Sequence, residues 1–187
     1  MSDELIRRSS LITHHSSLSS SFSSAFTLIE ILIVIVIIGI LGAVVLPKFS
    51  DAASTARENT LKDDLRYLRT QIVVFKAQHN DTPPGYPTGN RLAAPTEADF
   101  LEQMTKPTDD ACRVGAGANY PYGPYVNKMP PNPLNGKETV LVVPNGAAMP
   151  PGGLPDNSTG WIYKPQTLEI VPNSPGVDRD GTAYVDY

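Results

Sequence analysis

One acidic residue, Glu30, lies inside a run of apolar side chains near the start of the chain. In the 21 residues from Phe26 to Leu46, only Thr27 and Glu30 have polar side chains. A helix of that length is roughly 30 Å long, enough to cross the hydrocarbon core of a bilayer. A charged side chain at mid-membrane costs about 2.5–3.5 kcal/mol, and less near an end. Glu30 therefore indicates a specific interaction that compensates for this cost.

Side chains that could support catalysis are few. Cys112 is the only cysteine, which excludes an intrachain disulfide, and outside the first 25 residues His79 is the only histidine. Nucleophilic catalysis by Cys112 would need a histidine and an orienting partner, so a partly buried, apolar role is expected instead. The sequence has no Gly-x-Ser-x-Gly, no paired histidines for zinc and no phosphate loop. We expect that the protein is not an enzyme.

The elements that position Glu30 follow from the pattern along the chain. Residues 1–25 are rich in serine and have no apolar period, so they form a separate region. The apolar run 26–46 is longer than the hydrophobic part of a signal peptide, which favours a retained transmembrane helix. Positive charges flank both sides of this run, and counting them does not settle its orientation.

A helical period continues after Pro47, where we expect a kink. Five apolar residues then repeat at spacings of four and three, which predicts one apolar stripe on an amphipathic helix over 47–79: Leu61, Leu65, Leu68, Ile72 and Phe75. Pro83 and Pro84 cannot continue the helix, so it should end near His79.

Residues 80–187 hold most of the 18 prolines and 14 glycines, which predicts long loops and short strands. A short helix is expected over Glu97–Met104, with Thr96 as its N-cap. Strands are expected over Thr139–Val143, Gly160–Lys164 and Thr167–Val171, the last two as a hairpin. The fold class is therefore α+β, with the long helix packed on a small antiparallel sheet and Trp161 as a core anchor.

Ser24-Ala25-Phe26-Thr27-Leu28-Ile29-Glu30, followed by an apolar helix, resembles the N-terminal signature of the type IV pilin superfamily. The resemblance implies cleavage between Ala25 and Phe26 by a prepilin peptidase, which removes residues 1–25 as a leader. It also implies methylation of the new amine of Phe26. Ala25 stands where the family usually has glycine.

The same resemblance implies that Glu30 neutralises the N-terminal amine of a neighbouring subunit during assembly. A carboxylate in the first turn of a helix is also favoured by the helix dipole. Gly39 and Gly42 would allow close approach of helices or local melting, or are ordinary membrane glycines. Pro47 matches the place where the family's helix leaves the membrane.

The rest of the chain resembles the G-type major pseudopilins of type II secretion systems. The shared features are Leu61-Lys62-Asp63-Asp64-Leu65, the stretch from Gly123 to Gly136, and Gly160-Trp161-Ile162-Tyr163. This resemblance implies a calcium ion in the C-terminal loop, for which Asp178 and Asp180 are the candidate ligands, with Asn173 or Asp186. Such oxygen ligands suit a hard cation, and a solvated acidic turn accounts for the pattern equally well.

The expected function is that of a structural subunit of a secretion pseudopilus, a filament that helps to drive proteins across the outer membrane. The alternative is a type IV pilus subunit for adhesion, motility or DNA uptake, although a single cysteine forbids the disulfide common in such pilins. The expected location is the bacterial inner membrane, with 80–187 in the periplasm. Partners would be further copies, prepilin peptidase, other pseudopilins and the secretion platform. A net charge of −4 without basic clusters argues against nucleic acid.

Overall fold

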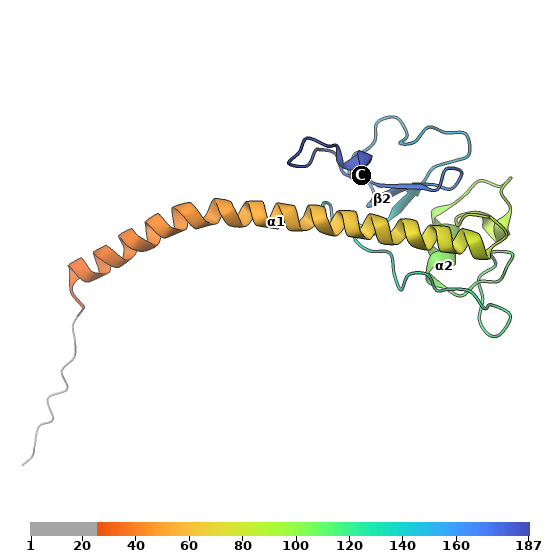
Figure 1. Ribbon diagram of the computed structural model, residues 1–187, viewed down its shortest axis with the longest axis horizontal. Helices are drawn as coiled ribbons and strands as arrows, with labels where there is room; N and C mark the ends of the chain where they lie inside the picture. The colour runs from red at the N-terminus through yellow and green to blue at the C-terminus, as the bar shows by residue number, and fades with distance from the viewer. Residues whose placement is uncertain (1–25) are drawn as a thin grey trace, which may run out of the picture. The chain divides into compact units, whose positions relative to one another are not determined.

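The computed structural model describes residues 26–187, and for residues 44–51 it describes the backbone alone. The chain divides into two compact units, Met1–Leu46 and Pro47–Tyr187, which are described separately below. Helix α1 (Leu28–Gln78) belongs to both units and is assigned without interruption through Pro47 (Figure 1). The expected leader, including Ala25, lies outside the described residues, and so does the side chain at which the kink was expected.

In the first unit, α1 exposes apolar side chains on every side. The large apolar residues from Phe26 to Leu41 are exposed by 45–83 %, because no other element covers them in the part of this unit that the structure describes. The expected span 26–46 includes 44–46, whose side chains are not described. Over the described residues, no helix combines the length and the apolar character that crossing a membrane requires.

The second unit confirms the predicted apolar stripe of α1. Leu61, Leu65, Leu68, Ile72 and Phe75 are each at most 1 % exposed. Their period brings all five to one face of the helix, and that face joins the same core as the sheet residues. The helix ends at Gln78, close to the end predicted from the prolines that follow.

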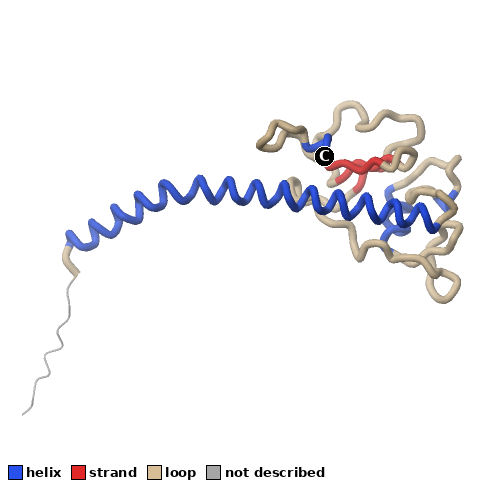
Figure 2. Tube along the Cα trace, viewed as in Figure 1, coloured by secondary structure: helices blue, strands red, loops and turns tan. Residues whose placement is uncertain are grey.

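Three short strands form the sheet: β1 (Val140–Val142), β2 (Trp161–Lys164) and β3 (Glu169–Pro172), in the order β1-β2-β3. The hairpin of β2 and β3 was predicted and is antiparallel. The prediction of an all-antiparallel sheet was wrong, because β1 runs parallel to β2, with Val140 opposite Trp161. Parallel pairing needs a long crossover, and residues 143–160 supply it as one of the loops drawn in tan in Figure 2.

The remaining elements close the core. Helix α2 (Glu97–Thr105) begins as predicted, with Oγ1 of Thr96 accepting a hydrogen bond from the backbone N–H of Asp99. Phe100 of α2 is fully buried, and its ring centroid lies 4.6 Å from that of Tyr163. Two 3₁₀ turns complete the fold, η1 (Pro87–Gly89) and η2 (Tyr184–Asp186).

Candidate functional site

The start of α1 is a capping box built from Thr27 and Glu30. Oγ1 of Thr27 accepts a hydrogen bond from the backbone N–H of Glu30 at 3.2 Å. In return, Oε2 of Glu30 accepts from the backbone N–H of Thr27 at 3.5 Å. The first N–H groups of a helix have no partner within the helix, so each side chain satisfies one of them. The carboxylate also lies at the positive end of the helix dipole.

The capping box gives Glu30 a role within a single chain that the sequence analysis did not include. The signal was present, because Thr-x-x-Glu before an apolar run is the sequence pattern of a capping box. In the described structure Phe26 is 71 % exposed. The carboxylate of Glu30 is thus held near the start of α1, four residues after Phe26, where the predicted cleavage would create an amine.

Gly39 and Gly42 lie on the exposed part of α1. A Cβ atom added at either position would meet no other atom within 4 Å. Packing against the described residues therefore does not require glycine at these positions. Their predicted role in contacts between helices stays a prediction.

At the C-terminal end, Asp178 forms a closed turn, in which the predicted ligand Asp180 contributes its backbone N–H group. Its Oδ1 accepts from the backbone N–H groups of Asp180 and Thr182, each at 2.9 Å. Its Oδ2 accepts from the hydroxyl of Tyr187 at 2.6 Å. This hydrogen bond from Tyr187 is the largest of the causes that lower the pKa of Asp178. The carboxylate is therefore ionised and already has hydrogen-bond donors on both oxygens.

Asn173, the third predicted ligand, belongs to a different network. It is fully buried, and its side-chain amide donates to Asp156, Ser158 and Thr159. Its Oδ1 accepts from the backbone N–H of Asp156 at 2.8 Å. In the part of the chain that the structure describes, no group of three acidic, histidine or cysteine side chains could hold a metal ion. These residues, as arranged, do not fit a calcium site, and calcium binding stays a prediction.

Buried amides fix the long crossover before β2. Asn132 is fully buried, and its amide donates to the carbonyl of Gly160 at 2.7 Å and to the hydroxyl of Ser174. The amide of Asn135 donates to the carbonyls of Thr159 and Asn173. The Pro-Asn-Pro-Leu-Asn-Gly stretch, which carried part of the family resemblance, therefore ties the crossover to the end of β3.

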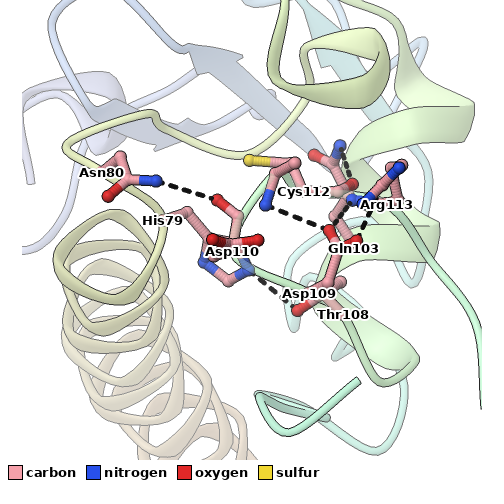
Figure 3. A network of polar contacts seen from close by, with 9 residues as sticks. His79, Asn80, Gln103, Thr108, Asp109, Asp110, Cys112 and Arg113 are labelled. Atoms are coloured by element: carbon pink, nitrogen blue, oxygen red, sulfur yellow. Dashed lines mark hydrogen bonds and ion pairs between the residues drawn. The ribbon is translucent and has the colours of Figure 1, made fainter. Parts of the chain in front are cut away.

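A second polar network lies beyond the end of α1 (Figure 3). His79 is fully buried, with Nδ1 at 2.7 Å from the carbonyl of Phe75 and Nε2 at 2.9 Å from the hydroxyl of Thr108. Its ring stacks on that of Phe75 at 3.8 Å between centroids. Burial lowers the pKa of His79 below its ordinary value. The neutral imidazole is therefore favoured, as one donor and one acceptor.

The same network fixes the loop after α2. Gln103 accepts from the backbone N–H of Gly85 and donates to the carbonyls of Tyr86 and Cys112. Asp109 forms an ion pair with Arg113 at 2.7 Å. These contacts join the segment after α1 to the segment after α2, a structural role that the sequence analysis missed.

Cys112 has the buried, apolar role that was predicted. The side chain is buried, and desolvation raises the pKa of its thiol to about 12. A thiol is a nucleophile in its deprotonated form, so Cys112 is a poor nucleophile at neutral pH.

Comparisons with known proteins find a family motif at the start of α1 and relatives over most of the chain. Residues 21–46 match the prokaryotic N-terminal methylation motif. The type II secretion system core protein G of Escherichia coli (strain K12) is 32 % identical over 73 % of this chain and 89 % of its own length. The protein of the same name from Dickeya chrysanthemi is 30 % identical over 70 % of this chain and 79 % of its own length. No solved structure matches the chain.

Proposed function

The chain belongs to the family of type II secretion system core protein G, and we propose that it is cleaved before Phe26 and then assembles into a filament. It is a structural subunit of a secretion pseudopilus. Both similar proteins carry the name of the secretion system, so a surface pilus is not favoured. The finer steps proposed here are processing by a prepilin peptidase, methylation of Phe26, and assembly through α1.

The observation that carries this proposal is the capped start of α1. Thr27 and Glu30 hold each other's backbone N–H groups, and the apolar side chains that follow are exposed on all sides. An exposed apolar surface of this kind needs either lipid or other copies of the helix to cover it. In the proposed sequence of events, lipid of the inner membrane covers it first and neighbouring subunits cover it in the filament.

Glu30 is proposed to change partners between these two states. In the single chain its carboxylate accepts from Thr27. In the filament it would accept from the Phe26 amine of the next subunit, an ion pair that is favourable only if both charges are buried together. The pair would then set the stagger between neighbouring helices, with the domain 47–187 in the periplasm.

The test is the variant Glu30→Ala in the full chain, with Asp99→Ala as a matched control. Asp99 holds the corresponding third position of α2, where its backbone N–H donates to the N-cap Thr96. We expect Glu30→Ala to be cleaved and inserted in the membrane but not assembled, and Asp99→Ala to assemble. Filaments are counted after overproduction, and mass spectrometry reads the N-terminus. Normal assembly by Glu30→Ala would contradict the proposed exchange, and a mature N-terminus other than methylated Phe26 would contradict the proposed processing.

A further inference from the structure

Residues 176–187 form a closed segment at the C-terminal end of the second unit. Val177 and Ala183 pair as an antiparallel bridge, and the backbone N–H of Tyr184 donates to the carbonyl of Gly176 at 3.2 Å. Turn η2 follows directly. We call residues 176–187 the C-terminal segment, and in Figure 1 its dark blue end lies beside α1.

Three residues along α1 contact the C-terminal segment. Oε1 of Glu58 accepts from the hydroxyl of Tyr184 at 3.3 Å. The ammonium group of Lys62 lies 4.4 Å from the ring centroid of Tyr187. Further along, the guanidinium of Arg69 donates to the backbone oxygen of Tyr187 and, at 3.0 Å, to that of Ile170 in β3. The side of α1 next to the core stripe thus holds the segment along its length.

Asp178 is the centre of these contacts. Its side chain is 4 % exposed, and four groups, three hydrogen-bond donors and one ion-pair partner, surround its two oxygens. Two are the backbone N–H groups of its own turn, and the third is the hydroxyl of Tyr187. The fourth is the ammonium of Lys62, 3.8 Å from Oδ2. A buried carboxylate is costly unless it is paired and hydrogen-bonded, and here Lys62 supplies the positive charge.

We propose that Lys62, Asp178 and Tyr187 form a clasp that fixes the C-terminal segment on α1 without a metal ion. The clasp uses the carboxylate that a calcium ion at this loop would have to bind. Calcium takes six to eight oxygen ligands, and to reach Oδ2 of Asp178 it would displace the hydroxyl of Tyr187. It would also stand beside the ammonium of Lys62, which repels a cation.

The clasp concerns how the domain holds its own C-terminal segment, so it stands or falls independently of filament assembly. Tyr187 has two roles in it. Its hydroxyl donates to Asp178, and its ring faces Lys62, a cation–π contact. Removing the hydroxyl alone therefore leaves the ring contact in place and isolates the hydrogen bond.

The test is thermal unfolding of the full chain in detergent, with added CaCl₂ or with a chelator. We expect the same Tm in both conditions. Tyr187→Phe and Lys62→Met should each lower Tm, and the double variant should lose less than the sum of the two because they share Asp178. Asp180→Asn is the matched control, since its side chain lies on the exposed side of the turn and would matter for a cation alone.

A calcium-dependent rise in Tm that Asp180→Asn abolishes would overturn the clasp and establish the calcium site in its place. An unchanged Tm in Tyr187→Phe and in Lys62→Met would also overturn it. Both variants keep the backbone and the turn of Asp178 intact, so the test does not depend on a variant that lacks this carboxylate.

Discussion

The two halves of α1 are one helix with opposite surroundings. In the first half, Ile35 and its apolar neighbours are exposed on all sides. In the second half, buried apolar side chains lie on a single stripe, and Leu68 is fully buried in the core that this stripe shares with residues of the sheet and α2. The second half has its partner within the chain, whereas the first half has none among the residues that the structure describes. A helix with one apolar stripe is thus expected to pack on its own domain. A helix that is apolar on all sides is expected to be covered by something outside that domain.

The first test of this difference removes a large apolar side chain from each half of α1. Leu68→Ala leaves a cavity in the core and should lower the free energy of unfolding by about 2–5 kcal/mol. Ile35→Ala removes an exposed side chain and should leave the unfolding of the domain unchanged. Circular dichroism of both full-length variants in detergent, heated in parallel, measures the difference. Equal losses in the two variants would show that both halves are packed in the single chain.

Glycines allow a second comparison with a smaller expected effect. A Cβ at Gly160 would lie 2.1 Å from the carbonyl oxygen of Lys137, whereas a Cβ at Gly39 would meet nothing within 4 Å. Gly160→Ala should therefore push the segment of Lys137 away from the residue that precedes β2 and cost about 1–3 kcal/mol.

Gly39→Ala should leave domain stability unchanged, because a helix tolerates alanine well. Chemical denaturation of the two variants gives both values. A neutral Gly160→Ala would mean that the loop of Lys137 moves freely. A loss of filaments in Gly39→Ala, with the fold intact, would place that glycine in a contact between subunits.

The sequence predicted features that depend on one element alone and missed those that depend on distant parts of the chain. The stripe from Leu61 to Phe75 was predicted because the helical period depends on the helix alone. The parallel pairing of β1 was missed because alternation along a strand does not reveal the direction of its neighbour. The roles of Asn132 and Asn173 were missed because their partners, backbone groups and side chains alike, lie far along the chain. Local patterns predict local elements, and long-range polar contacts need the structure.

The two ends of α1 differ in how far their polar side chains are buried. This difference allows a last test, with the smallest expected effect. Glu30 is exposed at the start of the helix, whereas His79 is fully buried just beyond its end. Asp109 and Asp110 favour the charged imidazole, as does the carbonyl of Phe75, but burial outweighs them and the pKa of His79 lies below 6.5. The rings of Tyr122 and Tyr125 also pack against it.

The unfolded chain therefore takes up a proton at His79 before the folded chain does. The contribution of His79 to stability is complete above about pH 6.5 and is lost as the pH falls toward the lowered pKa of the folded state. Unfolding free energies measured between about pH 7.5 and pH 5 should decline in the wild type. His79→Gln should be less stable at neutral pH, because glutamine cannot keep both hydrogen bonds, but its decline should be shallower. Equal slopes in the two proteins would show that folding does not lower the pKa of His79, and that burial beyond the end of α1 does not disfavour the charged imidazole.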